Sequence, residues 1–311
     1  MKGIRIVGVG SYVPKKSVSN EDMSKIVDTS DEWIRSRTGI GRRYFANEES
    51  NAELAAKAGI KAMESSGIDK DKICCVIVAT FTPDNYTPSV ASEVHGLLGL
   101  PREAMAFDLN AACTGFIYSL QVAKGLLAEN QDKFALIIGS EVISRVLDFT
   151  DRTTCVLFGD GAGAAVVKYC AESQMYSVNG CKSNFDVLYC KNNSEEKGIK
   201  MIGSEVFKFA VESIEESLHS LAKESGISLN DIDYIVCHQA NERIISRVQK
   251  NLNLSKEKFF MDVEEYGNTS AASIPIAIDD MNKKNMLNRG DKVIMVGFGA
   301  GLLWSGLLIE W

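Results

Sequence analysis

The stretch that decides the fold is residues 107–123, FDLNAACTGFIYSLQVA. Its first residues are typical of the end of a β-strand, whereas Phe116, Leu120 and Ala123 recur at helical spacing. Cys113 lies between the two patterns, where the helix is expected to begin. Unpaired N–H groups and the positive end of the helix dipole favour a negative charge there. We therefore expect the Cys113 thiol to ionise more easily than a free thiol and to act as a nucleophile. The alternative is a small buried core residue.

Length and composition indicate an ordinary globular protein. The 311 residues are 45% hydrophobic and 24% charged, and could form two similar halves. A net charge of -7 argues against a nucleic-acid binder. The apolar runs are shorter than the roughly 18 residues of a membrane span, and a strand pattern follows Met1 and Lys2 directly, so we expect neither a membrane span nor a signal peptide. The eight cysteines lack metal-ligand spacing, so no bound metal is expected. Several of them lie inside apolar runs, as reduced core cysteines do, which favours a cytoplasmic protein.

Helical patterns alternate with continuous apolar runs along the chain. Ser50 and Glu53 form a capping box that predicts a helix to about Ser66. Continuous apolar strands predict sheets that are covered on both faces. The polar segment 183–200 is expected to be an irregular excursion on the surface.

Three pairs of similar short segments indicate an internal duplication. The tripeptide SGI occurs at 66–68 and 225–227, each time shortly before an apolar strand. FDL at 107–109 resembles MDV at 261–263, and FGDGAG at 158–163 resembles FGAG at 298–301. Because the similar segments occur in the same order along both parts of the chain, we predict two pseudo-symmetric halves, residues 1–170 and 171–311. Cys113 and Asn268 would then face each other, each at the start of its helix.

His238 is the candidate histidine of the three in the chain. It follows the apolar run DYIVC, at a strand end where α/β proteins place ligand-binding groups. His95 and His219 lie within helical patterns and are interpreted as ordinary helix residues. A thiol, an imidazole and a carboxamide would thus share one pocket. The alternative is that His238 is a structural residue, hydrogen-bonded at the edge of a sheet.

Five ordered motifs resemble those of the β-ketoacyl-acyl carrier protein synthase III family. They are DEWIRSRTGI, AACTGF, FGDGAGAA, HQAN and GNTSAAS. The resemblance covers the whole chain and is weakest over 175–200. It implies a thiolase-like αβαβα layered fold, with the nucleophile in the half 1–170 and the His and Asn in the half 171–311. It also implies a homodimer.

The activity implied is a decarboxylative Claisen condensation. An acyl-CoA primer and malonyl-acyl carrier protein would give 3-oxoacyl-acyl carrier protein and CO2, at the start of type II fatty acid synthesis. By resemblance Cys113 is the nucleophile, and His238 and Asn268 stabilise the enolate formed on loss of CO2. The backbone N–H groups of Cys113 and Ala300 would form the oxyanion hole, although the family usually has glycine at position 300. No metal or redox cofactor is implied.

The resemblance also assigns substrate contacts. The coenzyme A tunnel would be lined by Trp33, Arg37, Arg152, Phe207 and Asn241. Without it, Trp33 would be a packing anchor and the two arginines solvated charges. Thr87 would lie in the acyl pocket, where members restricted to short primers commonly carry Phe, and Thr153 stands where glycine is frequent. The basic residues Lys208, Arg243, Arg247 and Lys250 form either a solvated face or the surface for the acyl carrier protein.

Three alternatives remain open on the sequence. The same fold could transfer acyl groups to a different acceptor in secondary metabolism, although HQAN and GNTSAAS favour decarboxylation. A Cys-His-Asn hydrolase shares the residue order but lacks the papain-type surroundings of the cysteine. An inactive acyl-CoA-binding or scaffold protein would not need a complete triad.

Overall fold

The computed structural model describes residues 2–191 and 198–311. Within them, seven strands follow one another in the order β10-β11-β12-β7-β6-β4-β5, and β1 pairs with β7 at the side of this path. These strands are β1 (Lys2–Tyr12), β4 (Ile73–Ala79), β5 (Met105–Leu109), β6 (Phe134–Glu141), β7 (Gly161–Cys181), β10 (Tyr234–Cys237), β11 (Lys292–Gly299) and β12 (Leu303–Glu310).

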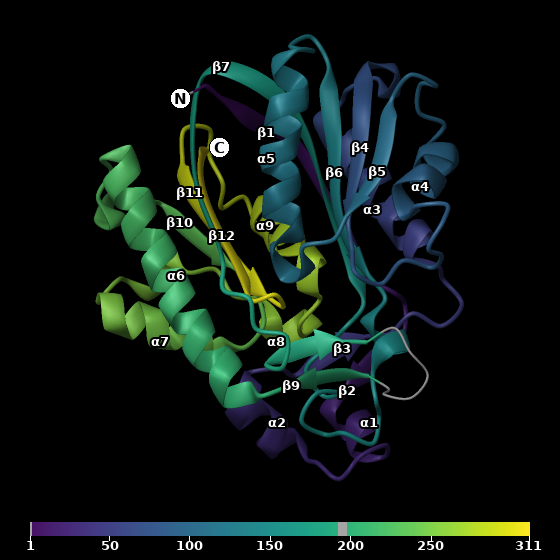
Figure 1. The fold of residues 1–311 in the computed structure, drawn as a ribbon, viewed down its shortest axis with the longest axis vertical. Helices are drawn as coiled ribbons and strands as arrows, with labels where there is room; N and C mark the ends of the chain where they lie inside the picture. The colour runs from purple at the N-terminus through teal and green to yellow at the C-terminus, as the bar shows by residue number, and fades with distance from the viewer. Residues whose placement is uncertain (1, 192–197) are drawn as a thin grey trace.

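β7 connects the strands of the two halves. Up to Gln174 it pairs with β1 and β6, and from Met175 onward it pairs with β12. Figure 1 shows it passing at the top from one group of strands to the other. Residue 170 lies inside this strand. The division of the chain into residues 1–170 and 171–311 therefore stays a prediction.

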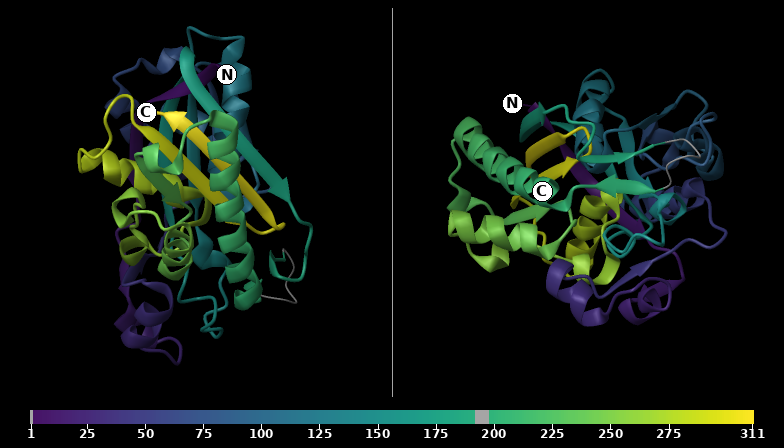
Figure 2. Two further views of the ribbon diagram at one scale, coloured as in Figure 1. Left: turned by 90° about the vertical axis from the view of Figure 1, so that its left-hand side faces the viewer. Right: turned by 60° about the horizontal axis from the view of Figure 1, so that its bottom comes forward.

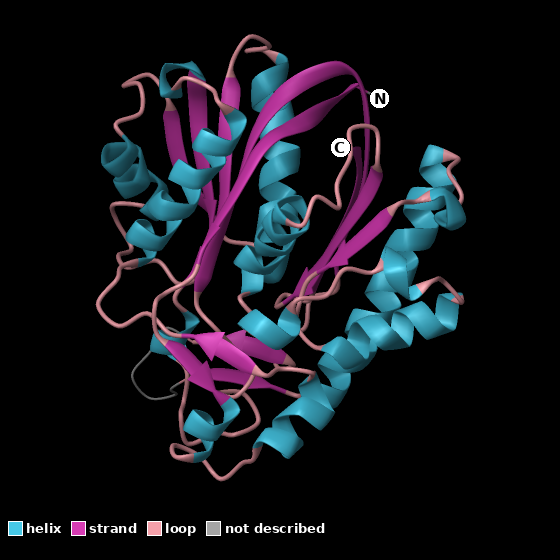
Figure 3. Cartoon of the chain, turned by 180° about the vertical axis from the view of Figure 1, so that it is seen from behind, coloured by secondary structure: helices cyan, strands magenta, loops and turns pink. Residues whose placement is uncertain are grey.

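Helices cover the strands on both sides and also lie between the two groups. α5 (Gly115–Ala128) and α9 (Ser273–Lys283) lie in the middle (Figure 3), α3 (Asn51–Ser66) and α4 (Val90–Leu98) cover the first group, and α6 (Gly203–Ser225) and α7 (Glu242–Leu252) cover the second (Figures 1 and 2). The expected αβαβα layering is confirmed. The expected capping box is also present, because Ser50 and Glu53 exchange side-chain and backbone hydrogen bonds at the start of α3.

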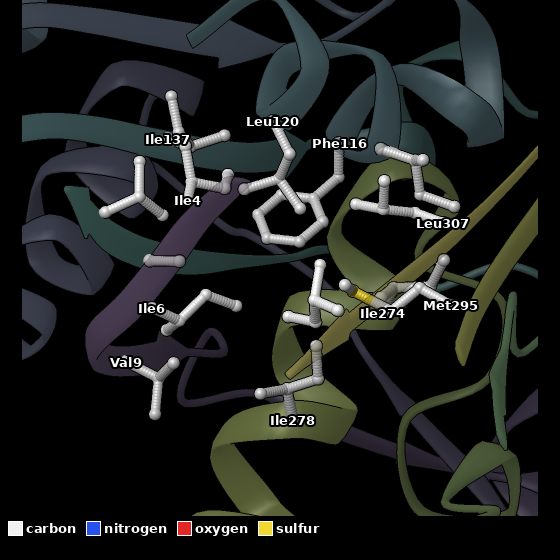
Figure 4. Close-up of a cluster of buried hydrophobic side chains, with 14 of the residues drawn as sticks. Ile4, Ile6, Val9, Phe116, Leu120, Ile137, Ile274, Ile278, Met295 and Leu307 are labelled. Carbon is white, nitrogen blue, oxygen red and sulfur yellow. The ribbon is translucent and has the colours of Figure 1, made fainter. Parts of the chain in front are cut away.

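Alternating side chains on continuous apolar strands produce the layers. In β6, Ile137 packs into the central cluster with Phe116 of α5 and Ile274 of α9, and Figure 4 shows these three side chains gathered together. Its neighbours Leu136 and Ile138 point to the other face and pack with α3. A strand that is buried on both faces needs apolar residues at successive positions, which explains the runs in the sequence.

Glycines let the central helices approach the strands closely and reveal the internal repeat. A Cβ on Gly297 of β11 would lie 3.0 Å from the Cys113 carbonyl oxygen, in the turn η2 (Ala112–Thr114) that precedes α5. A Cβ on Gly139 of β6 would lie 2.2 Å from the carbonyl oxygen of Ala271, in the turn η6 (Ser270–Ala272) that precedes α9. The two turns are therefore equivalent, and Ala271 occupies the position that corresponds to Cys113.

The asparagines before these turns show the same correspondence. Asn110 accepts a hydrogen bond from the N–H of Ala112 at 3.3 Å, and Asn268 accepts one from the N–H of Ser270 at 2.8 Å. Ala112 and Ser270 both have positive φ, 45° and 50°. The expected pairing of Cys113 with Asn268 as equivalent points is wrong, because Asn268 corresponds to Asn110.

Smaller elements gather at the end of the sheets where β5 and β10 finish (Figure 1). They include α1 (Asn20–Ser24), α2 (Asp31–Thr38), α8 (Val263–Tyr266) and two antiparallel pairs, β2 (Ser17–Ser19) with β3 (Arg42–Tyr44) and β8 (Leu188–Cys190) with β9 (Ile199–Met201). The expectation of an irregular excursion over 183–200 is wrong for β8 and β9, since Ile199 is buried. Residues 192–197 lie outside the described residues.

Of the helices described, none combines the length and the apolar character needed to cross a bilayer.

Candidate active site

A cavity of about 1450 Å³ opens at this end of the sheets. Cys113, His238 and Asn268 all line it, so the structure brings the three predicted residues together. Its wall also contains six further residues that were predicted to be in the site, namely Trp33, Arg37, Thr87, Phe207, Asn241 and Ala300. Arg152, Lys208, Arg243, Arg247 and Lys250 do not line it.

Cys113 lies in the turn η2, two residues before α5 begins at Gly115. The turn starts with Ala112 in the left-handed region, at φ 45°. The end of β11 runs close beside it, since a Cβ on Gly299 would lie 3.1 Å from the Cys113 nitrogen. The Cys113 thiol donates a hydrogen bond to the hydroxyl of Ser270, with Sγ and Oγ 3.3 Å apart.

The expected easy ionisation of the Cys113 thiol is wrong. Burial raises the pKa of the Cys113 thiol to about 12, above its ordinary value of 9.0, although its hydrogen bond with Ser270 acts in the other direction. A charge at a helix end gains at most about 2 kcal/mol. The loss of water around a thiolate outweighs that gain here. The thiol therefore rests protonated, and its proton must leave when the sulfur reacts.

His238 follows β10, is buried and lines the cavity. The backbone N–H of His238 donates to the carbonyl of Val296 in β11 at 2.7 Å, which continues the parallel pairing of β10 with β11. Burial lowers the pKa of the His238 imidazole to about 3, so the ring is neutral at ordinary pH. The ring also packs edge-on against Phe298, with centroids 5.1 Å apart.

Ser273 bonds to Nδ1 of His238 and can set the tautomer of the ring. The Ser273 oxygen accepts the N–H of Gln239 at 3.3 Å and lies 2.7 Å from Nδ1 of His238. Its own proton can be donated to Nδ1, which then acts as the acceptor. Since a neutral imidazole carries one proton, Nε2 is then the protonated nitrogen and can donate to a group in the cavity.

Asn268 is held by the segment FGDGAG on one side and by η6 on the other. Its N–H donates to Leu157 at 2.8 Å, and its carbonyl accepts from Gly159 at 3.0 Å. The side-chain oxygen accepts the N–H of Ser270 at 2.8 Å. This bond identifies Oδ1 and leaves the Nδ2 donors for the cavity. The FGDGAG turn thus positions Asn268, consistent with its interpretation as a turn that supports the site.

Two cations stack on the indole of Trp33, which lines the cavity. The guanidinium carbons of Arg37 and Arg152 lie 5.0 Å and 5.3 Å from the ring centre of Trp33. Arg152 also pairs with Asp28 at 3.3 Å. Asn241, the N-cap of α7, donates from Nδ2 to the carbonyl of Arg37 at 3.1 Å. An indole with two exposed guanidinium groups can bind an aromatic ring and anionic phosphates.

The predicted basic residues are exposed on two neighbouring helices. Lys208 lies on α6, whereas Arg243, Arg247 and Lys250 lie on α7. The guanidinium of Arg243 lies 6.0 Å from the ring centre of Phe207, which itself lines the cavity. The basic surface therefore borders the site.

Sequence reasoning missed a buried carboxyl group beside the site. Glu141 is the last residue of β6 and is fully buried. Its carboxylate accepts hydrogen bonds from the hydroxyls of Thr80 at 3.0 Å and Thr82 at 2.5 Å. Burial raises the pKa of Glu141 to about 8, although these hydrogen bonds act to lower it. A charged residue directly after the apolar run FALIIGS was the available signal.

No three His, Cys, Asp or Glu side chains among the described residues are arranged to hold a metal ion.

Comparisons with known proteins agree over the whole chain. Residues 107–182 match the family model described as 3-oxoacyl-[acyl-carrier-protein (ACP)] synthase III, and residues 222–311 match the model of its C-terminal part. A beta-ketoacyl-[acyl-carrier-protein] synthase III of Clostridium acetobutylicum is 49% identical over 326 aligned positions, which cover 100% of this chain and 99% of that protein.

Solved structures give the same result. The 3-oxoacyl-(acyl carrier protein) synthase III of Pseudomonas aeruginosa PAO1 is 36% identical and superimposes with a TM-score of 0.94, over 99% of this chain and 98% of that one. The priming beta-ketosynthase of the R1128 polyketide biosynthetic pathway is 32% identical with a TM-score of 0.93, over 99% and 96%.

Proposed function

The chain belongs to the 3-oxoacyl-[acyl-carrier-protein] synthase III family, and we propose that Cys113, His238 and Asn268 carry out the condensation that initiates fatty acid synthesis. The observation that carries this assignment is the single cavity in which the Cys113 thiol lies with two neutral nitrogen donors. The substrates that we propose are an acyl-CoA primer and malonyl-acyl carrier protein, and the products are 3-oxoacyl-acyl carrier protein, coenzyme A and CO2.

The first half-reaction loads the acyl group onto Cys113. The sulfur attacks the thioester carbonyl of the acyl-CoA, and coenzyme A leaves. Negative charge builds on the carbonyl oxygen in the transition state. The backbone N–H groups of Cys113 and Ala300 are the proposed donors to this oxygen, supported by the approach of β11 to the turn η2 at Gly299.

The second half-reaction forms the carbon nucleophile. When the malonyl group loses CO2, the electron pair passes into an enolate with charge on the thioester oxygen. The Nε2–H of His238 and the Nδ2–H of Asn268 are the proposed donors to that oxygen. A neutral imidazole suits this role because it offers a proton to the oxygen without depending on its own titration near pH 7. The enolate carbon then attacks the acyl-Cys113 carbonyl, and the thiolate leaves.

The remaining surfaces fit the two carrier groups. We assign Trp33, Arg37, Arg152, Phe207 and Asn241 to the coenzyme A moiety, supported by the guanidinium groups stacked on Trp33. We assign Lys208, Arg243, Arg247 and Lys250 to the acyl carrier protein, supported by their exposure beside the cavity. Thr87, on the cavity wall, is assigned to the acyl pocket.

Cofactor, assembly and location complete the proposal. The reaction changes no oxidation state, so the chemistry of Cys113, His238 and Asn268 needs no redox cofactor, and N–H donors take the place of a metal ion. We also propose a cytoplasmic location and, as the family resemblance implies, a homodimer. Secondary metabolism with another acceptor has less support, because the polyketide enzyme is 32% identical and the Clostridium acetobutylicum enzyme 49%.

Product analysis tests the proposed function. The protein is incubated with a panel of acyl-CoA thioesters and malonyl-acyl carrier protein, and the products are identified by mass spectrometry. We expect 3-oxoacyl-acyl carrier protein, one two-carbon unit longer than the primer. An ester or amide product, or hydrolysis of the acyl-CoA alone, would contradict the proposal.

A further inference from the structure

Gln239 is a fully buried carboxamide directly after His238, and it does not line the cavity. Its Nε2 donates to the carbonyl of Cys237 at 2.8 Å and to the carbonyl of Phe260 at 3.2 Å. Its Oε1 accepts the N–H of Asp262 at 3.1 Å. A buried amide is stable only when its polar atoms are hydrogen-bonded, and these three bonds satisfy both ends of the group. The side chain therefore ties the segment after β10 to residues 260–262.

The Gln239 carboxamide takes the place of a backbone peptide group. One parallel bridge joins β10 to the segment beside it, with the N–H of Phe260 donating to the carbonyl of Ile235 at 3.3 Å. Beyond this bridge the Gln239 side chain donates to Phe260 and accepts from Asp262, two positions further on, as a strand peptide does in a parallel ladder. In the first half no side chain is needed for this, because β5 pairs with the backbone of β4 over its whole length.

Gln239 also holds the segment that carries Asn268 on both sides. Before Asn268, the residue bonded to the Gln239 side chain is Asp262, which begins α8, and its carbonyl accepts the N–H of Tyr266 at 3.3 Å. After Asn268, the oxygen of Ser273 accepts the backbone N–H of Gln239 at 3.3 Å. The segment from 262 to 273 is thus bonded at both ends to the residue that follows His238.

We propose that Gln239 is a positioning residue that sets the separation of His238 and Asn268, so that both donors reach one thioester oxygen. The inference rests on the proposed role of these two residues as donors to the enolate oxygen. His238 is otherwise bonded to β11 and Asn268 to the FGDGAG segment, which are separate parts of the fold. Two N–H groups stabilise the same oxygen only when both lie within hydrogen-bond distance of it. Gln239 acts through the donors, because it does not line the cavity.

The test compares the two half-reactions in Gln239→Met, which keeps the length of the side chain and removes its three hydrogen bonds. Release of CO2 from saturating malonyl-acyl carrier protein should fall by about 10- to 100-fold, because a misplacement of about 1 Å can cost about 10²-fold. The KM for malonyl-acyl carrier protein should stay at the wild-type value. Labelling of Cys113 by radiolabelled acetyl-CoA should keep the wild-type rate, since the bonds of Gln239 go to β10, residues 260–262 and Ser273.

A double-mutant cycle with Asn268→Ala tests positioning directly. Once the Asn268 amide is absent, no second donor is left whose place Gln239 can set. We therefore expect the double variant to release CO2 as fast as Asn268→Ala alone, whereas independent effects would multiply. The proposal is overturned if the two effects multiply, or if Gln239→Met slows acylation as much as it slows decarboxylation.

Gln121→Met provides the matched control. Gln121 in α5 also makes three side-chain hydrogen bonds, from Nε2 to Asn179 at 3.0 Å and to Ser305 at 3.1 Å, and to Oε1 from Asn179 at 2.9 Å. It does not line the cavity either. Its loss should leave both half-reactions unchanged. An equal fall of CO2 release in Gln121→Met would overturn the proposal, because the effect would then come from any lost carboxamide.

The same measurements distinguish this inference from the proposed function. If wild-type protein releases no CO2 from malonyl-acyl carrier protein, or if Asn268→Ala releases it at the wild-type rate, the proposed function fails. If Asn268→Ala slows the release and Gln239→Met does not, only the role of Gln239 fails. Near-ultraviolet circular dichroism verifies that each variant is folded. Where Gln239→Met does not fold, Gln239→Glu takes its place in the cycle, because it keeps the acceptor for Asp262 and loses the Nε2 donors.

Discussion

The hydroxyl of Ser273 lies 2.7 Å from Nδ1 of His238, at the place where the first half of the molecule puts Gly115 against Ala79. The duplicated frame is the same in both halves, and the side chains at these two positions differ. The first half has the small side chains of Ala79 and Gly115 at these positions. The second half has the imidazole of His238 and the hydroxyl of Ser273. The site is therefore an asymmetric use of a nearly symmetric fold.

Ser273→Ala should weaken decarboxylation and spare acylation. A hydrogen bond from the Ser273 hydroxyl to Nδ1 favours the tautomer of His238 that carries its proton on Nε2. Without this bond the ring can adopt the other tautomer, which cannot donate into the cavity. Loss of one neutral hydrogen bond, about 1 kcal/mol, corresponds to a fall of about 5- to 10-fold. The rate of CO2 release from malonyl-acyl carrier protein measures it. Ser119→Ala, which removes a buried hydroxyl bonded to Gly115 in α5, is the control, and an equal effect of both variants would contradict the assignment.

Arg37→Ala and Arg152→Ala should raise KM for acyl-CoA with little change in kcat. Both guanidinium groups stack on Trp33, which is assigned to the nucleotide end of coenzyme A, and neither contacts Cys113. Such contacts are equal in the ground and transition states. Steady-state kinetics measure the two constants, with the exposed Arg102→Ala as the control. A fall of kcat by orders of magnitude at saturating acyl-CoA would contradict the assignment of these arginines to the nucleotide end of coenzyme A.

The acyl pocket should accept primers longer than acetyl. Thr87 lines the cavity, and so do the apolar side chains of Phe81, Leu157 and Phe158. A threonine leaves open the volume that an aromatic ring would fill. Wild-type kcat/KM should hold from acetyl-CoA to primers of four to eight carbons, and Thr87→Phe should selectively lose the longer ones. A sharp fall beyond acetyl in the wild type would refute this prediction.

Much of the site could be predicted from the sequence because its residues follow strands. His238 comes directly after a continuous apolar run, and Cys113 lies where a strand pattern gives way to a helical one. Both patterns reflect local backbone structure, which neighbouring residues determine. The layered fold follows in the same way from strands that are apolar at successive positions.

The protonation states could not be predicted, because they depend on burial and on contacts distant in the sequence. Burial raises the pKa of the Cys113 thiol, which reverses the effect expected from a helix end. Glu141 ends a strand as many solvated carboxylates do, and only the fold shows that it is fully buried beside Ser270. The β8–β9 pair was missed because its segment is largely polar.

Glu141 should make the protein less stable as pH rises from about 4.5 to 8. Burial raises the pKa of folded Glu141 to about 8 from an ordinary 4.5, so in this window the unfolded chain has lost a proton that the folded protein keeps. The stabilising effect is complete below pH 4.5 and is lost as pH approaches 8, with a slope of at most about 1.4 kcal/mol per pH unit. Urea unfolding at pH 5, 6.5 and 8 measures it. Glu141→Gln should lack this contribution, and identical slopes in both proteins would rule it out.

The two half-reactions should separate by residue. Cys113→Ala should abolish acyl transfer from acyl-CoA and all condensation, yet leave measurable decarboxylation of malonyl-acyl carrier protein, because the thiol does not bind the malonyl oxygen. Asn268→Ala should still take up label from acyl-CoA, because its Nδ2 donors serve charge that develops only when CO2 leaves. Loss of one such donor typically costs about 10²–10³ in rate, so decarboxylation and condensation should fall by that factor. His238→Ala should behave similarly.

Asn268→Ala is the cleaner of the two donor variants. Its side chain carries no charge, so it cannot stabilise a Cys113 thiolate as an imidazolium could, and its Oδ1 bonds to the N–H of Ser270 in the turn η6. Asn110→Ala provides the matched control, because Asn110 makes the equivalent bond to Ala112 in the other half. Acylation is followed by labelling of Cys113, and decarboxylation by release of CO2. If Asn268→Ala loses acylation as completely as Cys113→Ala, while Asn110→Ala keeps it, then Asn268 acts in acyl transfer and the division of labour between thiol and donors is wrong.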